Sequence, residues 1–415
     1  MEEARSRGAK TSALRYYLLL AVSWNLGALA FFKYYNFLGT TLNDMGDILG
    51  IGISIPDLSI LLPVGISFYT FQISAYTVDV YRNKIQAEKS FSDLLLFLVY
   101  FPQLVAGPIE RAERLLPMLK NLRPANSGML ISGMYLALWG VFKKVFISDN
   151  LIPIVDLTLA SRAEVPFPGY FFISIVFAIQ VYADFSGYTD IARGISRMMG
   201  VELSMNFHLP FLSSNPAEFW RRWHITLGSF WRDYVYIPLG GSRVSAFFQA
   251  RNVIAIFVIG GLWHGASWGF VIWGFYCGIL VWLYLVTEPL IRRIEGAIPG
   301  GASVFLYLGR AYTFLTFSSG LLLFRAPTLP DLAHIWNHFL PDPREAGAIS
   351  TDILWRILFF STPLLLMQFF QNRQKKMELF LELNRTLRYT LLAVGGVLFI
   401  LLGAFRTEQF FYFQF

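Results

Sequence analysis

Long runs of apolar residues recur along the whole chain, and they constrain its fold more than any other feature. A helix needs roughly 20 largely apolar residues to cross the hydrocarbon core of a bilayer, where backbone polar groups must find partners inside the protein. With 55% hydrophobic residues, 15% charged residues and a mean hydropathy of +0.51, the composition differs from that of an ordinary soluble domain. The sequence therefore predicts an integral membrane protein that crosses the bilayer many times.

A series of apolar runs defines the candidate helices of an all-α transmembrane bundle. They are residues 13–35, 61–81, 91–105, 129–147, 168–185, 252–263, 268–287, 304–324, 353–370 and 389–405. Two of them, 91–105 and 252–263, fall short of the crossing length and run into Pro or Gly, which favours re-entrant or broken helices lining a cavity. Residues 186–251 are rich in Trp, Arg and Gly, so we predict interfacial helices and loops there. No repeat divides the chain, and residues 1–415 are predicted to form one domain.

Basic residues lie in the short loops between the apolar runs rather than along one stripe. The net charge of +7 therefore indicates a membrane protein that follows the positive-inside rule, and not a partner of nucleic acid. The basic loop 372–388 is predicted to be cytoplasmic, so that run 389–405 crosses outward and residues 406–415 lie on the extracytoplasmic side. Run 91–105 has basic residues on both flanks, as a re-entrant hairpin would.

The residue inventory argues against several kinds of chemistry. Cys277 is the single cysteine, so the chain forms no internal disulfide and no cysteine-based metal site. No second ligand at metal-binding spacing lies near His224 or His264, and we expect neither a metal nor another bound cofactor. There is no Walker-type phosphate loop and no Gly-x-Ser-x-Gly elbow, so ATP-driven transport and serine hydrolysis have no support.

Histidine titrates near neutral pH and therefore suits a general base. The chain has five, and His264 stands apart because it ends an apolar run between Gly261 and Gly265. A titratable residue at membrane depth is costly and by default marks a functional site, and glycines permit the close approach of a ligand or another backbone. The alternative is a structural histidine satisfied by a hydrogen bond.

His224 follows a predicted helix start. Asn215 is a favoured N-cap residue, Pro216 suits the first helical position, and Glu218 places negative charge in the first turn. On that helix, Trp220 and His224 are four residues apart and would share a face. Two interpretations stay open: a functional histidine, or an aromatic and basic helix at the membrane interface, where Trp and Arg belong.

Several phrases along the chain resemble one known family. They are LPVGISFYTF at 62–71, YFPQLVAGPI at 100–109, YADFSGY at 182–188, FWRRWH at 219–224, FWRDY at 230–234 and GLWHGASW at 261–268. Together they are similar to the membrane-bound O-acyltransferases, and within that family to the branch that acetylates alginate and D-alanylates teichoic acid. The resemblance spans most of the chain. It implies a funnel-shaped helical protein whose thin centre is crossed by a tunnel.

The resemblance also implies roles for individual residues. The catalytic histidine of the family corresponds to His264, which would act as the base, and a second, upstream histidine corresponds to His224. His224 would either position the acyl group or stabilise the developing oxyanion. The acyl donor would be a cytoplasmic thioester, either acetyl-coenzyme A or an acylated carrier protein. Guanidinium groups match phosphate oxygens, so the candidates for binding the donor are Arg221, Arg222, Arg232 and Arg243. Each arginine has a headgroup or helix-capping role as its alternative, and Asp184 either supports the site or satisfies a structural hydrogen bond.

The two ends of the chain carry further expectations. The aromatic tail 408–415 resembles a C-terminal motif of this branch in which a tyrosine hydroxyl passes the acyl group to a secreted or periplasmic acetyltransferase partner, which makes Tyr412 a candidate relay nucleophile. An aromatic anchor at the membrane interface is the alternative. Members of this branch usually have further hydrophobic segments before the phrase at 26–37, so N-terminal spans of the family are expected to be missing here, either because the start is truncated or because the protein is naturally short.

The leading hypothesis is a multi-pass O-acyltransferase of a bacterial inner membrane. It would transfer an acyl group, acetyl in the first instance, from the cytoplasmic donor across the bilayer onto an extracellular polysaccharide such as alginate. Within this class, the alternative is D-alanyl or other acyl transfer onto a different surface polymer. From another class, the alternative is a transporter or flippase without covalent chemistry, although the paired broken helices of secondary transporters are not visible in the sequence.

Overall fold

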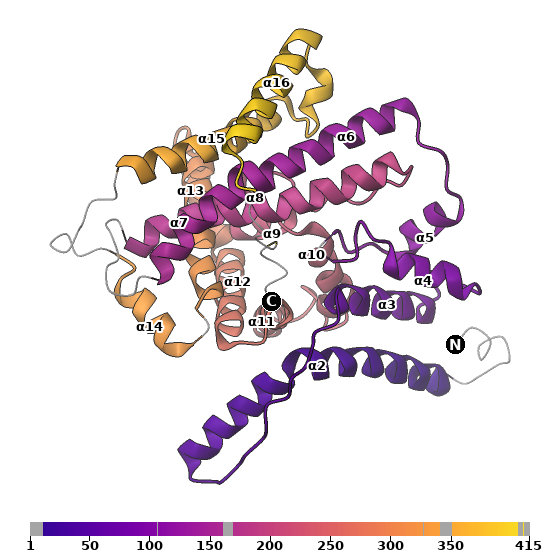
Figure 1. Cartoon of the computed structure of the whole chain (residues 1–415). Coiled ribbons are helices and arrows are strands. Elements are labelled where there is room, and N and C mark those ends of the chain that lie inside the picture. Colours follow the sequence, from indigo (N-terminus) through magenta and orange to yellow (C-terminus); the bar gives the residue numbers. More distant parts are fainter. Residues whose placement is uncertain are drawn as a thin grey trace.

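The computed structural model of the chain describes residues 11–105, 107–160, 169–326, 328–340, 351–405 and 410, and this part of the chain consists of helices joined by loops (Figure 1). The longer helices are α2 (Thr11–Leu49), α3 (Ile66–Tyr81), α6 (Ser127–Phe142), α7 (Asp149–Ala160), α8 (Gly169–Met198), α11 (Ala246–His264), α12 (Trp268–Ala297), α13 (Gly301–Phe324), α15 (Thr351–Gln374) and α16 (Arg385–Leu402). The shorter elements are α4 (Phe91–Val99), α5 (Ala112–Lys120), α9 (Pro216–Arg222), α10 (Ile225–Trp231), α14 (Leu329–Asn337), the 3-10 turns η2 (Pro210–Leu212) and η4 (Leu379–Glu382), and the π-helical segments η1 (Lys143–Ser148) and η3 (Arg232–Tyr236). The predicted all-α fold is confirmed.

Seven stretches of helix in the described residues are long and apolar enough to cross a membrane. They are Thr11–Leu49, Ser127–Leu159, Gly169–Met198, Ala246–His264, Trp268–Ala297, Thr351–Gln374 and Arg385–Leu402. Their burial differs widely, because 83% of the apolar window of α8 lies inside the molecule whereas 0% of the window of α16 does. The chain is therefore a polytopic bundle in which α8 is central and α16 presents its apolar side chains outward, as lipid contact requires.

One of the two runs predicted to be short needs a correction. Run 252–263 is not a short, broken helix, because α11 begins at Ala246 and its 19 residues are sufficient to cross. The sequence AFFQAR at its start mixes polar and apolar residues and so escaped a search for apolar runs. Run 91–105 does contain a short helix, since α4 has nine residues. The place of α4 relative to the membrane stays a prediction.

Helix α8 extends well beyond the predicted span 168–185 and ends at Met198. Its second half carries charged residues that looked interfacial in the sequence but find partners in the fold. Arg197 donates to Glu202 at 2.7 Å and to Glu378 at 2.8 Å, so its charge is neutralised where only 8% of the residue is exposed. The predicted region of short helices and loops therefore begins at about residue 199 and not at 186.

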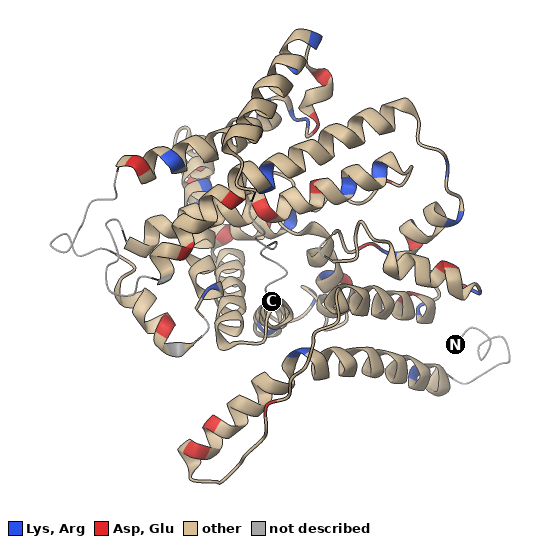
Figure 2. Cartoon of the chain, viewed as in Figure 1, with Lys and Arg blue, Asp and Glu red and all other residues tan. Residues whose placement is uncertain are grey.

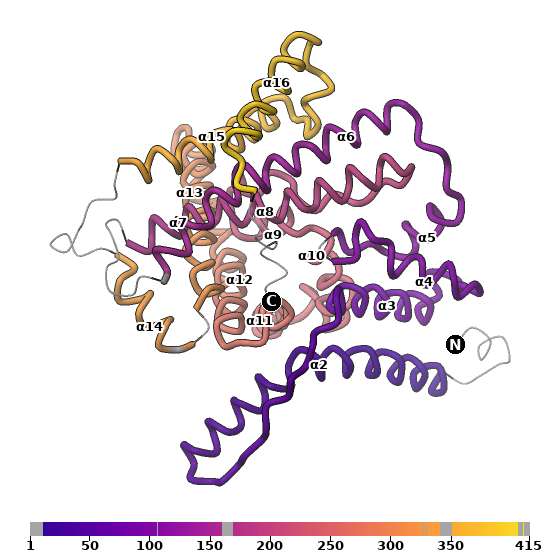
Figure 3. The backbone as a smooth tube through the Cα atoms, viewed as in Figure 1, coloured from indigo at the N-terminus to yellow at the C-terminus, as the bar shows by residue number. Residues whose placement is uncertain are grey.

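Two pairs of glycines bring α6 and α8 into close contact, and the two helices lie side by side in Figure 1. A Cβ atom on Gly140 would lie 2.5 Å from the carbonyl oxygen of Gly187, and one on Gly194 would lie 2.5 Å from that of Gly133. Small residues at such a crossing let two membrane helices approach closely. Beyond the crossing, the chain continues through η1 into α7 as one helical path, which Figure 3 traces.

Candidate active site

His264 is the last residue of α11, and it lies inside the bundle with 8% of its surface exposed. Its ring makes edge-to-face contacts with Trp273 on α12 and Phe324 on α13, at centroid distances of 5.4 and 5.2 Å. Both aromatic residues are themselves buried. The imidazole is therefore surrounded by the protein interior and not by lipid-facing side chains.

Helix α9, which precedes the second histidine, starts as the sequence predicts. Asn215 is the N-cap, and its side-chain oxygen accepts a hydrogen bond from the Glu218 N–H at 2.8 Å, while Pro216 occupies the first helical position. The helix then ends at Arg222.

The backbone leaves the helical path before His224, so the prediction that Trp220 and His224 share a helix face is wrong. His224 has a left-handed backbone with φ of 46°. The cause is pairing with another segment, because Phe207 and Trp223 form an antiparallel bridge and the Ile225 N–H donates to the Asn206 carbonyl at 3.0 Å. These contacts stabilise a conformation that costs a non-glycine residue energy.

The imidazole of His224 is oriented by Asn206 and Thr226. Both the backbone N–H and the hydroxyl of Thr226 donate to Oδ1 of Asn206, at 3.2 and 3.0 Å, which identifies that atom as the carbonyl oxygen of the amide. Nδ1 of His224 lies 3.2 Å from the same oxygen, so Nδ1 carries the proton and donates. Burial lowers the pKa of His224 to about 3, and the ring is neutral at physiological pH.

The indole of Trp263 contacts both histidines. Its ring centroid is 4.9 Å from that of His264 and 6.1 Å from that of His224. Phe185 of α8 also contacts His224, at a centroid distance of 4.7 Å. The structure thus places both predicted histidines in one buried, aromatic region, where α8, α11 and the α9–α10 connection meet. Their catalytic roles stay a prediction.

Buried charges of both signs lie where η1 packs on α8, and Figure 2 shows charged positions of both signs on α8. Lys144 forms ion pairs with Asp184 and Asp149, each at 2.8 Å. Lys143 pairs with Asp190 at 2.7 Å and donates to the Ser186 hydroxyl at 2.8 Å. Asp184 therefore has an ion-pairing role that the fold itself accounts for, and a catalytic supporting role stays a prediction.

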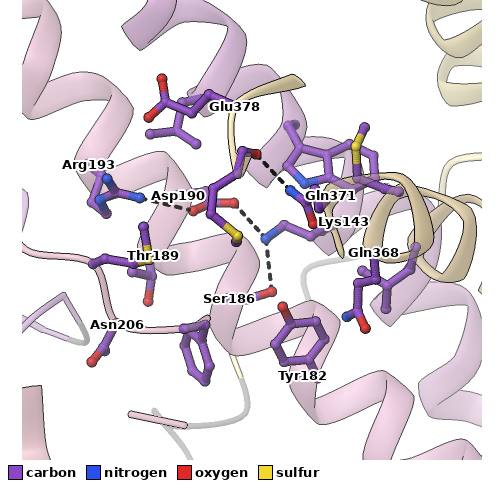
Figure 4. A pocket seen from close by; sticks show the side chains of 17 residues that line it. Lys143, Tyr182, Ser186, Thr189, Asp190, Arg193, Asn206, Gln368, Gln371 and Glu378 are labelled. Atoms are coloured by element: carbon purple, nitrogen blue, oxygen red, sulfur yellow. Dashed lines mark hydrogen bonds and ion pairs between the residues drawn. The ribbon is translucent and has the colours of Figure 1, made fainter. Parts of the chain in front are cut away.

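A polar pocket lies between α6, α8 and α15 (Figure 4). Its polar lining comprises Lys143, Tyr182, Ser186, Thr189, Asp190, Arg193, Asn206, Gln368, Gln371 and Glu378. Asn206 connects this pocket to the histidine pair, because its amide also orients His224. The residues that line the pocket do not include either histidine. The tunnel expected to reach His264 therefore stays a prediction.

Comparison with known sequences decides the family. Residues 79–297, which include α8, α11, α12 and both histidines, match the profile of the membrane-bound O-acyltransferase family, MBOAT. The chain belongs to this family. Both buried histidines lie within the region that matches the family, and the resemblance noted in the sequence is confirmed.

Three relatives illustrate the similarity. Over 324 residues the chain is 39% identical to a probable alginate O-acetylase, AlgI, of Pseudomonas aeruginosa, a match that covers 78% of this chain and 60% of the relative. It is 35% identical over 311 residues to the peptidoglycan O-acetyltransferase of Helicobacter pylori, covering 69% and 58%. A more distant similarity, 25% over 249 residues, is to the teichoic acid D-alanyltransferase of Bacillus subtilis, covering 58% and 63%. The chain spans about three fifths of the length of these relatives.

The four arginines proposed to bind the donor of this MBOAT protein do not form one cluster of unpaired cations. Arg222 pairs with Glu218 of its own helix at 2.6 Å, and Arg232 pairs with Asp233 at 2.7 Å. Arg221 and Arg243 are exposed. Donor binding by these residues stays a prediction.

Tyr412 lies outside the described residues, but Phe410, two residues earlier in the chain, is described. The Phe410 ring lies 4.6 Å from Nζ of Lys144 and makes an edge contact with Tyr188 of α8 at 4.8 Å. The tail thus contacts the central helix of the bundle at Phe410.

Sequence reasoning missed several residues of this region. Lys143 and Lys144 interrupt an apolar run, and such lysines signal buried partners, here the acids of α8. Asn206 gave no signal, since only the fold places it beside His224. In the described residues, no three His, Cys, Asp or Glu side chains gather in a way that could hold a metal ion.

Proposed function

We propose that this chain transfers an acyl group, acetyl in the first instance, from a cytoplasmic thioester across the membrane onto hydroxyls of an extracellular polysaccharide such as alginate. The observation that carries the proposal is the pair of buried histidines, His264 and His224, whose rings both contact Trp263. Family membership and the identity to alginate O-acetylases support an O-acetyltransferase. The lower identity to teichoic acid D-alanyltransferases makes D-alanyl transfer the second candidate.

His264 acts as the general base in this proposal. Its imidazole takes the proton of the incoming hydroxyl as that oxygen attacks the thioester carbonyl, and it returns the proton to the departing thiolate. An ester and a free thiol result. A positioned base contributes typically about 10²–10⁴-fold to the rate. The aromatic rings of Trp273 and Phe324 around the imidazole limit access of water, which would otherwise hydrolyse the thioester.

His224 positions a substrate group in this proposal and does not stabilise the oxyanion. A neutral imidazole whose Nδ1–H donates to Asn206 presents a lone pair at Nε2, which accepts a hydrogen bond. An oxyanion needs donors, whereas a hydroxyl needs an acceptor. The proton of the attacking hydroxyl goes to His264, so the tautomer favours a hydrogen bond to His224 from another hydroxyl of the acceptor.

Orientation in the membrane follows from the basic loop 372–388, which we place in the cytoplasm of a bacterial inner membrane. The donor, acetyl-coenzyme A or an acylated carrier protein, then approaches from that side with no bound cofactor required, and Arg221, Arg222, Arg232 and Arg243 are candidates for its phosphates. The tail from 406 onward is extracytoplasmic. There Tyr412 would accept the acyl group and pass it to a secreted or periplasmic acetyltransferase.

The test follows a radioactive acetyl group. Purified protein is incubated with labelled acetyl-coenzyme A and alginate, and the label on protein and polymer is counted for the native chain, His264→Ala and His338→Ala. His338 is the matched control because it is also a histidine but lies at the C-cap of another helix, α14. We expect His264→Ala to lose transfer while remaining folded, and His338→Ala to retain it. Transfer near the native level in His264→Ala would refute the proposal, and polymer movement that survives without label transfer would favour a transporter.

A further inference from the structure

Lys33 is the only charged residue between Arg15 and Asp44 in the membrane-spanning helix α2. A charged side chain inside a span is expensive, so it normally faces a partner with a functional or structural purpose. Lys33 is half-buried, in a helix of which only 11% of the apolar window is buried. Lys33 therefore needs partners within the protein that offset the cost of placing a charge in this helix.

The partners of Lys33 are backbone carbonyls at the end of α11. Its ammonium donates to the Trp263 carbonyl at 2.5 Å and to the His264 carbonyl at 3.1 Å. The neighbouring Tyr34 hydroxyl donates to the Leu262 carbonyl at 2.7 Å. The α11 carbonyls that α2 satisfies thus include that of His264 itself.

The end of a helix leaves its last four carbonyls without partners inside the helix. In α11 these belong to residues 261–264. Gly265 donates to the first of them, the Gly261 carbonyl, at 3.4 Å. The other three are satisfied by Lys33 and Tyr34. All four terminal carbonyls of the helix that carries His264 therefore accept hydrogen bonds. Most of these bonds come from a helix more than 200 residues away in sequence.

A further contact, from Phe37, extends this interaction of α2 past the end of α11. Phe37, one helical turn beyond Lys33, makes an edge-to-face contact with Trp268, the first residue of α12, at 5.8 Å. The segment from Leu262 to Trp268 is thus contacted by α2 on both sides of the turn at Gly265. This segment determines where the His264 side chain points.

We propose that Lys33, assisted by Tyr34, is a positioning residue for His264. Its cation lies at the negative end of the α11 dipole and holds the last helical turn in place. In a medium of low dielectric constant such charge-assisted hydrogen bonds are strong, and the turn would fray without them. Lys33 acts through the backbone and does not contact the reacting atoms. The proposal rests on the role of His264 as the base.

The first experiment separates positioning from folding by kinetics. Lys33→Met, Lys33→Arg and Tyr34→Phe are compared with Asn43→Ala, a control on the same helix that removes two hydrogen bonds to Ile55 and none to α11. We expect Lys33→Met to lower kcat about 100-fold with little change in KM for acetyl-coenzyme A, because misplacing a catalytic group by about 1 Å can cost that much. Lys33→Arg should recover most of the activity, and Tyr34→Phe should lose less. If Lys33→Met does not fold, Tyr34→Phe and Lys33→Arg still decide.

A second readout does not depend on activity. The ring ¹⁵N resonances of labelled histidine are recorded in nanodiscs, and His264 is identified by the signal lost in His264→Ala. We expect Lys33→Met to shift or broaden this signal, and Lys33→Arg and Asn43→Ala to leave it in place. An unchanged His264 signal and an unchanged kcat in Lys33→Met would overturn the proposal. Full activity in His264→Ala would instead refute the proposed function, and the resonance would still report whether Lys33 positions the ring.

Discussion

Nδ1 of His224 donates a hydrogen bond to Oδ1 of Asn206 across 3.2 Å, and this contact sets which nitrogen of the ring carries the proton. Thr226 makes the assignment firm because its N–H donates to the same oxygen. Asn206 also lines the polar pocket between α6, α8 and α15. One buried amide therefore links the candidate active site to the charged interior of α8.

Replacing Asn206 should impair the site through the tautomer of His224. Asn206→Leu removes the acceptor and leaves the donors of His224 and Thr226 buried without it, at a cost of about 1–3 kcal/mol in stability. We expect a fall in kcat larger than that caused by Thr226→Val, which keeps the amide in place. Acetyl transfer and thermal unfolding in detergent measure the two effects. Native kcat in Asn206→Leu would contradict the assigned tautomer.

Stability should fall on mild acidification because of His224. An exposed histidine of the unfolded chain binds a proton below about pH 6.5, whereas burial keeps His224 neutral until about pH 3. The unfolded state thus binds more protons, and stability is lost as the pH falls from about 6.5 toward 3. Between pH 7 and 5 the native chain should lose about 2 kcal/mol more than His224→Gln. Equal losses in thermal unfolding would show that His224 is not buried as a neutral ring.

The pair of buried Lys143 and half-buried Asp190 should show the asymmetry of an internal ion pair. Lys143→Met removes one partner of a 2.7 Å contact and leaves a carboxylate in the interior, which costs about 3 kcal/mol. The double variant Lys143→Met with Asp190→Leu should recover most of that loss, since two apolar side chains replace two charges. Unfolding curves of the singles and the double test this. A double variant as unstable as the sum of the singles would argue against the pair.

The close contact of α6 and α8 should not tolerate a side chain at Gly140. A Cβ there would lie 2.5 Å from the Gly187 carbonyl oxygen, so Gly140→Leu must separate the helices and destabilise the fold by about 1–3 kcal/mol. Gly395→Leu on α16 is the control, because a Cβ at that position meets nothing within 4 Å. Melting temperatures of both variants provide the comparison, and similar values would mean that the helices are not in contact.

The tail should carry an acyl group if Tyr412 is a relay nucleophile. After incubation with acetyl-coenzyme A, mass spectrometry of the C-terminal peptide should show an added acetyl group that is absent in Tyr412→Phe. Phe411 and Phe413 flank this tyrosine and offer no nucleophile, so the adduct is diagnostic. An unmodified native tail under conditions where polymer becomes acetylated would leave the aromatic-anchor interpretation in its place.

Hydrophobicity alone was sufficient to predict an all-α membrane bundle, because burial of backbone polar groups in lipid permits few other structures. Local chemistry also predicted the start of α9, since Asn215 and Pro216 act within one turn of the helix. The ends of helices were less predictable. Helix α8 continues to Met198 because its charges meet partners from distant segments, and a search for apolar runs is blind to such partners.

The sequence by itself determined which residue types could do chemistry here: two histidines in distinctive phrases, and an apolar chain to bury them. Only the tertiary structure decided how they are arranged. It placed Trp263 in contact with both rings, brought Asn206 to the His224 ring, and brought the Lys33 ammonium to the backbone carbonyl of His264. These partners are far apart along the chain, so no periodicity or spacing encodes them. Helix packing alone brings them together, because buried polar groups must be satisfied by whatever segment lies beside them.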